Sequence, residues 1–335
     1  MNQEKMDQVV VITGASSGIG RETAVQLGRR GARVVLAARN EPALDETVRE
    51  VQQAGGQARA IPTDVSDWEQ VERLAQAAVN EFGRIDVWVN NAGISLYADI
   101  SETTPAEMKR IVEVNLLGEM YGTKAAFEQM KGQGSGVIIN VSSALARRSV
   151  PLQAAYCAAK HGVTGFTESV RLELEKDYPG IRLVEVLPSS INTPLFDHAR
   201  SKLGLKPMPI PPVYEPSVVA EAIVHACEHP QREVVVGGAG KAFVAAQQIS
   251  AGLVDRYLLQ GGRGVRQQKS GKPDDGRDNL FGPMPGPGSS TGDFGEGARA
   301  SSIYTEALEQ HPGRKLALAI AALGGTLLLV RGIGR

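Results

Sequence analysis

The first 237 residues alternate short, β-branched apolar runs with longer amphipathic stretches, and this alternation constrains the fold more than any other feature of the sequence. It is typical of βαβ units that form a parallel sheet. Most of the runs are apolar at every position, as strands are when helices cover both faces of a sheet. We therefore predict seven strands, at residues 8–13, 32–37, 57–62, 86–91, 136–142, 181–187 and 232–237.

The stretches between these runs indicate helices. Residues 67–82 and 105–130 carry apolar side chains three and four positions apart, which is the spacing of one helix face. The expected fold class is α/β: a Rossmann-type, doubly wound, seven-stranded parallel sheet with helices on both faces, followed by a largely irregular C-terminal tail. We assign residues 1–260 to this domain.

Charge and cysteine content exclude several classes of function. The chain has 335 residues, with 36 Lys and Arg against 37 Asp and Glu, so it has no global positive field for nucleic acid. Cys157 and Cys227 cannot form a disulfide framework or a metal finger, and His225 and His229 lack a third ligand, so we predict no metal. The first residues lack a cationic leader, and we expect a cytoplasmic protein.

The composition changes near residue 260. Of the forty residues 261–300, fifteen are glycine or proline, and little apolar periodicity remains. Such a stretch buries too little surface to offset its ordering entropy, so we predict a flexible linker at 261–312, with a surface-draped tail as the alternative.

The last predicted element is an apolar helix within residues 313–335, where the fifteen residues 316–330 carry no charge. Fifteen helical residues reach about 22 Å, against a hydrocarbon core of roughly 30 Å. A membrane anchor and a helix packed on protein remain alternatives, so membrane association through residues 316–330 is one of two expectations.

A glycine-rich loop directly follows the first predicted strand. Its glycines have the spacing G-x-x-x-G-x-G, and a helix begins near Arg21. Glycines there let the backbone turn tightly and let a pyrophosphate approach the helix N-terminus. The loop predicts a dinucleotide site to which it contributes Gly14, Ser16, Ser17, Gly18, Ile19 and Gly20.

The end of the second predicted strand indicates which dinucleotide binds. A carboxylate for the ribose 2′-hydroxyl is expected about twenty residues after such a loop. Here the sequence has Ala38, Arg39 and Asn40 instead. A guanidinium can bind a 2′-phosphate, and no carboxylate is present to repel it. We therefore predict NADP(H) in preference to NAD(H), with a solvated surface arginine as the alternative.

Four polar residues carry the candidate chemistry. Tyr156 and Lys160 stand four apart in a helical stretch, so they share one face. Ser143 lies thirteen residues before Tyr156 at the end of a strand, and Asn115 lies in an earlier helix. Together with the glycine loop and the sequence Asn90-Asn91-Ala92-Gly93, these motifs resemble the short-chain dehydrogenase/reductase family over residues 7–237.

The resemblance implies a role for each of these residues. Tyr156 would be the general acid/base, Ser143 would donate a hydrogen bond to the substrate oxygen, and Lys160 and Asn115 would belong to a proton relay. A cation about 4 Å away, at an effective dielectric of about 20, is worth roughly 4 kcal/mol, or some three pKa units. Lys160 is therefore expected to bring the pKa of Tyr156 close to neutrality.

The resemblance also implies the remaining contacts. Cofactor contacts are expected from Arg39, Asn40, Asp64, Val65, Asn91, Ala92, Gly93, Tyr156, Lys160, Pro188, Ile191 and Thr193. Substrate contacts are expected from Ser143, Leu145, Tyr156 and Phe196. The family usually has a glycine after the proline at position 188, where this chain has Ser189, which puts the local loop geometry in doubt.

The sequence thus predicts an NADP-dependent oxidoreductase that interconverts a carbonyl and an alcohol on a small hydrophobic substrate. The alternative is a dinucleotide-binding sensor or scaffold on the same fold, since a fold does not determine a function. The resemblance implies a homodimer or homotetramer.

Overall fold

A single parallel sheet forms the centre of the computed structural model, which describes residues 6–311 and 314. The strand order is β10-β7-β6-β4-β1-β2-β3. The central strand β1 pairs with a neighbour on each side, so that Val10 lies opposite both Val34 and Val87. The seven predicted strands are confirmed as β1 (Val9–Thr13), β2 (Arg33–Ala38), β3 (Gln57–Pro62), β4 (Val87–Asn90), β6 (Gly136–Val141), β7 (Ile181–Pro188) and β10 (Glu233–Val236).

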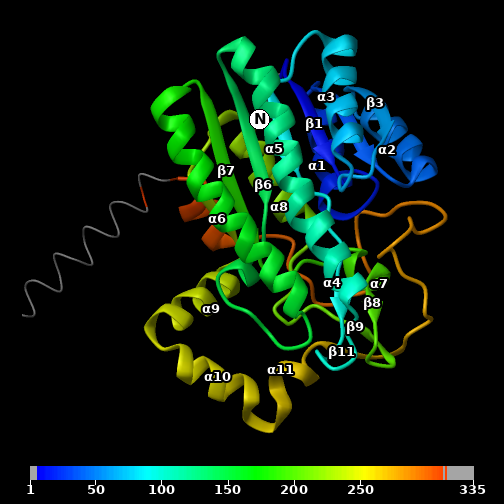
Figure 1. Ribbon diagram of the computed structural model, residues 1–335, viewed down its shortest axis with the longest axis vertical. Coiled ribbons are helices and arrows are strands. Elements are labelled where there is room, and N and C mark those ends of the chain that lie inside the picture. Colours follow the sequence, from blue (N-terminus) through cyan, green and yellow to red (C-terminus); the bar gives the residue numbers. More distant parts are fainter. Residues whose placement is uncertain (1–5, 312–313, 315–335) are drawn as a thin grey trace, which may run out of the picture.

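Helices cover both faces of the sheet (Figure 1). One layer contains α1 (Gly18–Arg29), α2 (Glu41–Gln53) and α8 (Pro216–Glu228), and the other contains α3 (Trp68–Phe82), α5 (Gly118–Gln133) and α6 (Ala154–Asp177). Successive strand residues point to opposite faces. Val10 and Ile12 therefore belong to the core beneath the first layer, whereas Val11 belongs to the core beneath the second.

The helix predicted at 105–130 is interrupted, which corrects that prediction. It divides into α4 (Pro105–Val112), a widened π-turn at Glu113–Leu117, and α5. A capping box formed by Thr104 and Glu107 starts α4. Apolar spacing cannot reveal a π-turn, because one extra residue in a turn hardly changes the periodicity. Such turns are frequent at functional sites, and this one contains Asn115.

Short elements surround the carboxyl end of the sheet. Strand β5 (Leu96–Tyr97) pairs with β8 (Arg200–Ser201), and β9 (Leu205–Pro207) pairs with β11 (Lys269–Pro273). A 3-10 turn at Ala144–Ala146 follows β6, and α7 (Leu195–His198) precedes β8. Beyond β10 the chain forms α9 (Gly238–Ile249), α10 (Ala251–Leu259), a 3-10 turn at Gln260–Gly262 and α11 (Arg263–Arg266), which extend past the end of the sheet (Figure 1).

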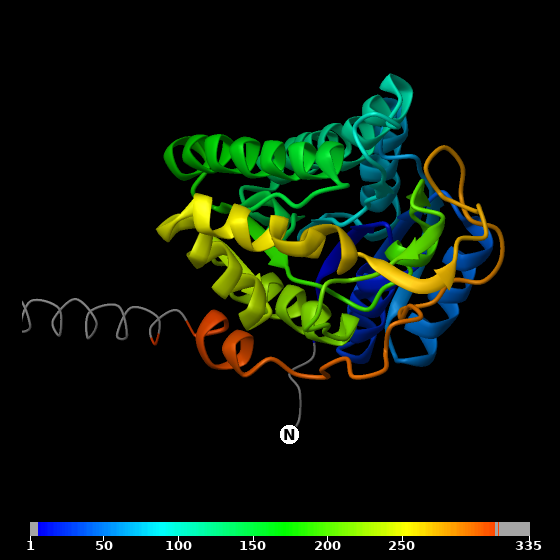
Figure 2. The same ribbon diagram turned by 90° about the horizontal axis from the view of Figure 1, so that it is seen from below.

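The structure corrects the linker interpretation of residues 261–312 wherever it describes them. After β11 the chain runs beside the blue elements of Figures 1 and 2 and returns to β10, where Thr305–Glu309 form a π-turn. Leu280 is fully buried, and the Arg39 side chain donates a hydrogen bond to the Asn279 carbonyl. The composition argument considered only apolar burial, whereas this segment is held mainly by hydrogen bonds to its backbone.

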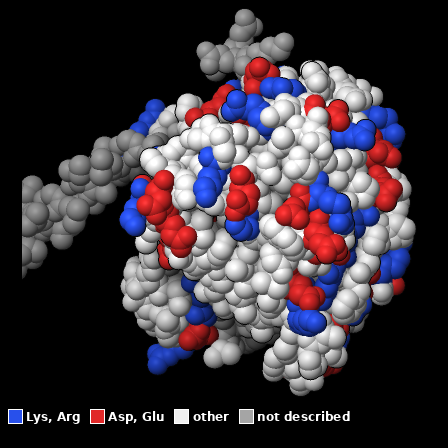
Figure 3. Space-filling model, turned by 45° about the horizontal axis from the view of Figure 1, so that its top comes forward, with Lys and Arg blue, Asp and Glu red and all other residues white. Residues whose placement is uncertain are grey.

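The apolar segment 316–330 lies outside the described residues. Within the part that is described, no helix is long and apolar enough to cross a membrane. Figure 3 shows basic and acidic side chains interspersed over the face in view, as expected for a net charge of -1.

Candidate active site

A cavity of about 460 Å³ follows the carboxyl end of the sheet, from the glycine loop at one end to α9–α11 at the other. Parallel-sheet proteins bind ligands at this edge. Of the predicted cofactor and substrate residues, only Gly20 does not line the cavity. The lining includes Gly14, Ser16, Ser17, Gly18, Ile19, Arg39, Asn40, Asp64, Val65, Asn91, Ala92, Gly93, Ser143, Leu145, Tyr156, Lys160, Pro188, Ile191, Thr193 and Phe196.

The glycine loop has the tight geometry that its sequence predicts. Gly14 and Gly18 have φ values of 67° and 57°, which strongly favour glycine. A side chain at Gly20 has no room beside the Gly14 carbonyl and the Asn91 amide, so Gly20 permits close packing rather than lining the cavity. The Asn91 amide donates a hydrogen bond to the Thr13 carbonyl (3.0 Å) and thereby ties the loop to the end of β4.

Charged groups lie at the glycine-loop end of the cavity. One guanidinium nitrogen of Arg39, Nη2, donates a hydrogen bond to the Asn279 carbonyl (2.7 Å), while Nη1 is buried without a partner. Burial lowers the pKa of Arg39. Asp64 forms a 2.7 Å ion pair with Arg110 and accepts a hydrogen bond from the Ser66 hydroxyl. Although burial raises the pKa of Asp64, these partners keep it below its usual value.

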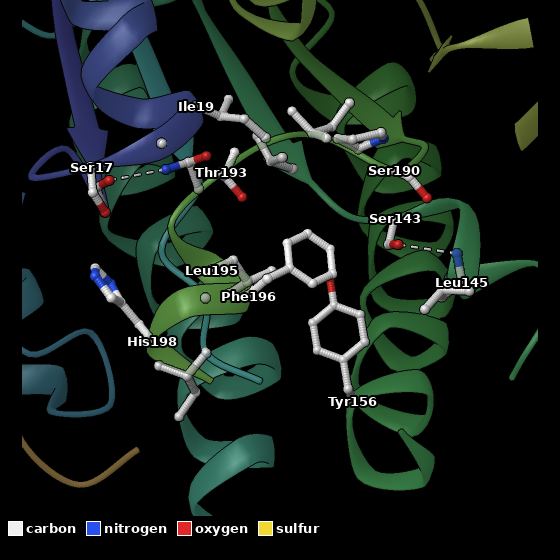
Figure 4. Close-up of a pocket in the computed structure, with 18 of the residues that line it drawn as sticks. Ser17, Ile19, Ser143, Leu145, Tyr156, Ser190, Thr193, Leu195, Phe196 and His198 are labelled. Atoms are coloured by element: carbon white, nitrogen blue, oxygen red, sulfur yellow. Dashed lines mark hydrogen bonds between the residues drawn. The ribbon is translucent and has the colours of Figure 1, made fainter. Parts of the chain in front are cut away.

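Tyr156 and Ser143 lie together at the end of the cavity opposite the glycine loop. Figure 4 shows the Tyr156 ring pointing from α6 toward Phe196, with Ser143 on the adjacent segment. Burial raises the pKa of Tyr156, against the opposing effects of the Lys160 charge and a hydrogen bond with Ser143. The Ser143 hydroxyl oxygen also accepts a hydrogen bond from the Leu145 backbone N–H (3.1 Å). The expected shift of the Tyr156 pKa toward neutrality is therefore wrong for this structure.

Part of the reason is a carboxylate that the sequence analysis missed. Lys160 donates hydrogen bonds to Glu119 Oε1 (2.5 Å) and to the Val141 carbonyl (2.8 Å), and the side chains of Lys160 and Glu119 are 4% and 2% exposed. Burial raises the pKa of Glu119, and the Lys160 ammonium opposes this rise. The Glu119 charge partly neutralises the effect of Lys160 on Tyr156. In the sequence Glu119 resembles a surface glutamate, and no local pattern identifies it.

Asn115 lies outside the cavity lining and is fully buried. Its amide donates a hydrogen bond to the Ile94 carbonyl (2.8 Å), and its side-chain oxygen accepts one from the Ile94 N–H (2.9 Å). These bonds join the π-turn to the segment after β4. The Asn115 side chain is thus committed to holding two backbone segments together.

The remaining wall near Tyr156 is largely apolar. Phe196, Leu145, Met208 and Ile210 line it, and the Phe196 ring centroid lies 6.3 Å from that of Tyr97, which the sequence analysis did not identify. Among the described residues only Leu152 combines a side chain with a positive φ, so Ser189 requires no such backbone conformation. The glycine-to-serine departure is thereby accommodated.

The sequence analysis also missed lining residues that come from the C-terminal region. Phe243, Tyr257, Leu258 and Gln268 reach the cavity from the α9–β11 region, and Asn279, Met284, Pro285 and Gly288 reach it from the tail. Nothing in their local sequence resembles a binding motif. In the described part of the chain, no three His, Cys, Asp or Glu side chains come together as a metal site.

Comparisons with known proteins place this architecture. The family model for short chain dehydrogenases matches residues 8–204. An uncharacterized oxidoreductase of Bacillus subtilis, YxnA, is 42% identical over 254 residues, covering 75% of this chain and 71% of its own.

Solved structures agree. A short-chain dehydrogenase/reductase from Burkholderia phymatum in complex with NAD is 26% identical at a TM-score of 0.68, covering 75% of this chain and 96% of its own. An alcohol dehydrogenase from Thermococcus sibiricus complexed with 5-hydroxy-NADP is 28% identical at a TM-score of 0.61. The match covers 69% of this chain and 96% of that one. The chain therefore belongs to the short-chain dehydrogenase/reductase family of NAD(P)-dependent oxidoreductases.

Proposed function

We propose that the protein is an NADP-dependent oxidoreductase that interconverts a small apolar ketone and its secondary alcohol. The supporting observation is the arrangement of one cavity: the glycine loop and Arg39 line one end, and Ser143, Tyr156 and Lys160 line the other. A dinucleotide laid along this edge would bring its nicotinamide toward Tyr156.

Two features fit such a cofactor. The glycine loop leads into the N-terminus of α1, whose partial positive charge favours a diphosphate. Arg39 Nη1 is a buried donor without a partner, and buried polar groups are rarely left unpaired. A 2′-phosphate supplies the acceptor that this nitrogen lacks. The two structural relatives above carry NAD in one case and a modified NADP in the other, so the preference depends on Arg39 rather than on the family.

The protein's own groups manage the proton. The chemistry that a bound nicotinamide supplies is hydride transfer. Tyr156 donates its hydroxyl proton to the carbonyl oxygen during reduction and accepts one during oxidation, while Ser143 donates a hydrogen bond to the same oxygen. Tyr156, whose pKa burial raises, is protonated at neutral pH as reduction requires, and the negative charge left on its oxygen after proton donation must be stabilised. Lys160, held by Glu119, stabilises negative charge on the tyrosine oxygen.

The walls around Tyr156 indicate the substrate class. Phe196, Leu145, Met208 and Ile210 offer apolar surface, whereas charged groups gather at the other end of the cavity. Burial of apolar substrate surface there is favourable, at roughly 25 cal/mol per Å². We infer a hydrophobic ketone rather than a charged sugar or acid.

We also propose that two copies associate through α5 and α6, which lie side by side on one face (Figure 1). Leu172 of α6 is 63% exposed, and glycine and alanine along these helices permit close helix approach. Light scattering at micromolar concentration should give the mass of a dimer or tetramer. A monomer would contradict this assignment.

An initial-rate screen tests the proposed function. We expect consumption of NADPH with at least one member of a panel of cyclic, aryl and long-chain ketones, and a lower kcat/KM with NADH. Charged keto acids serve as the control panel. Binding of NADPH without turnover on any carbonyl or alcohol would favour a sensor or scaffold.

A further inference from the structure

The tail segment 278–289, here called the strap, lies against the adenosine end of the cavity. It follows β11 and is the part of the orange chain that runs beside α2 in Figures 1 and 2. The domain holds it mainly through the strap's own carbonyl groups. Arg39 donates a hydrogen bond to the Asn279 carbonyl (2.7 Å), and Arg110 donates one to the Leu280 carbonyl (3.1 Å). The Asn40 side chain donates to the Met284 carbonyl (2.7 Å), and the Gly18 backbone N–H donates to the Ser289 carbonyl (2.8 Å).

Leu280 is the strap's apolar anchor. Its side chain is fully buried in the core beneath the α3, α5 and α6 layer. The adjacent Phe281 is 53% exposed, and its ring lies 5.1 Å from the Arg200 guanidinium. Because one side chain supplies most of the apolar attachment, replacing it should loosen the strap, whereas replacing its neighbour should not.

The strap sequence suits an ordered covering segment. Pro283, Pro285 and Pro287 restrict its backbone before it docks, which lowers the entropy lost on docking. A Cβ at Gly288 would overlap the Ser16 carbonyl oxygen and the Arg21 guanidinium, so the strap can approach the glycine loop and α1 closely only because this residue is glycine.

Two buried polar atoms indicate what lies beneath the strap. Arg39 Nη1 and Asn279 Oδ1 both lack partners, and both residues line the cavity. One is a donor and the other an acceptor. An adenosine phosphate carries complementary groups: phosphate oxygens, and the hydroxyl or amino hydrogens of its ribose and base. Both atoms therefore offer hydrogen-bonding capacity that a bound adenosine phosphate can use.

We propose that the strap is the outer wall of the adenosine half of the dinucleotide site. It closes over the bound cofactor, Asn279 Oδ1 accepts a hydrogen bond from the adenosine, and the strap slows cofactor release. Its carbonyl bond to Arg39 also orients the guanidinium. The inference rests on the proposed dinucleotide site and adds to it a binding element outside residues 8–204, which the family model matches.

Cofactor dissociation from the full chain is the test. NADPH fluorescence in a stopped-flow displacement experiment gives the release rate, and titration gives Kd. For Leu280→Asp we expect release about tenfold faster and Kd about tenfold higher, because the closed state is lost. Leu280→Ala should change both in the same direction by a smaller factor. Phe281→Ala is the matched control and should stay within about twofold of the wild type.

Asn279→Ala isolates the side-chain contact. We expect release about three- to tenfold faster, with an unchanged Tm in the absence of cofactor. Equal release rates in the wild type, Asn279→Ala and both Leu280 variants would overturn the proposal. So would tighter binding in the Leu280 variants, which would mean that the strap competes with the cofactor for groups such as the Gly18 N–H.

Limited proteolysis of the wild type gives a readout that needs no variant to fold. Arg277, whose side chain is 69% exposed, precedes the strap and offers a trypsin site. NADPH should slow cleavage there, and unchanged or faster cleavage would contradict a closing strap. If the wild type did not bind NADPH at all, the proposed function would fail. Normal NADPH binding with no strap effect would remove this inference alone.

Discussion

The sheet and the C-terminal tail are built on different physical principles. In the sheet, alternate strand residues such as Val10 and Val11 enter opposite cores, so stability comes from continuous apolar burial. The tail between β11 and residue 300 contributes one fully buried leucine, Leu280, and attaches mainly through backbone carbonyls. The first kind of order is visible in a periodic sequence. The second depends on hydrogen-bond donors that distant segments place beside the tail, so no local sequence pattern predicts it.

The sheet-and-helix region and the tail also differ in the functions that we assign to them. Every group that we assign to proton chemistry lies within the sheet-and-helix region, whereas the tail contributes Asn279, Met284, Pro285 and Gly288 to the cavity lining and packs Phe294 against Phe196. Substitutions in the first region should therefore alter turnover, and those at the joint between the regions should alter stability or cofactor affinity.

The largest effect is expected at Tyr156. Tyr156→Phe removes the hydroxyl that transfers the proton and should lower kcat about 10³-fold while leaving the Kd for NADPH nearly unchanged. Tyr178→Phe, just beyond the C-terminus of the same helix, is the control and should retain activity. Substantial turnover by the Tyr156 variant would show that the proton comes from elsewhere.

The next largest effect is a loss of stability, expected where the sheet-and-helix region contacts the tail. Glu107 is 4% exposed; its carboxylate accepts from Lys202 (2.8 Å) and Arg200 (3.3 Å), and Arg200 in turn holds Asp278 of the tail. Glu107→Gln should lower the free energy of unfolding at pH 7 by about 2–4 kcal/mol. Glu102→Gln, on the exposed loop before α4, should have little effect.

The same glutamate predicts a pH dependence. Burial raises its pKa, but the hydrogen bonds from Lys202, Thr104 and Arg200 lower it to about 2. A folded-state pKa below the usual 4.5 means that the stabilisation is present above pH 4.5 and is lost as the pH falls toward 2. Urea unfolding should therefore show a gap between the wild type and Glu107→Gln that closes over this interval. A gap that is constant with pH would contradict this origin.

A smaller effect is expected at Arg39, on the border between the regions. Arg39→Ala should weaken NADPH binding by about 1–3 kcal/mol and NADH binding by much less, because only NADPH carries the 2′-phosphate. Equal losses for both cofactors would mean that Arg39 serves to hold the Asn279 carbonyl rather than to select a phosphate.

The smallest effect concerns the pH profile. The Glu119 charge raises the pKa of Tyr156, so Glu119→Gln should lower that pKa. The alkaline limb of the ketone-reduction profile, where Tyr156 loses its proton, should then move toward lower pH. Glu113→Gln, in the π-turn directly before α5 and paired with Lys109, should leave the profile in place. An unmoved or upward-shifted limb would show that Glu119 does not act on Tyr156.

Most of the sheet was predictable because its signal is local and repeated, and the motif residues were predictable because they sit at strand ends and helix starts. The π-turn at Asn115 was missed since an added residue barely alters apolar spacing. Glu119 resembles a surface glutamate in sequence, and only the packing of α5 against α6 buries it beside Lys160. Desolvation, which reversed the expected direction for Tyr156, is likewise a property of the folded state.

Isotope transfer from cofactor to substrate tests the proposed reductase activity. The full-length protein is mixed with NADPH deuterated at the transferable position and with the best ketone from the panel, and the alcohol is analysed by mass spectrometry and NMR. We expect one deuterium on the carbinol carbon, transferred to one face. The Tyr156→Phe variant should bind the cofactor and give almost no labelled alcohol. Bound NADPH that passes no label to any carbonyl, with identical behaviour in the wild type and Tyr156→Phe, would contradict the proposed activity.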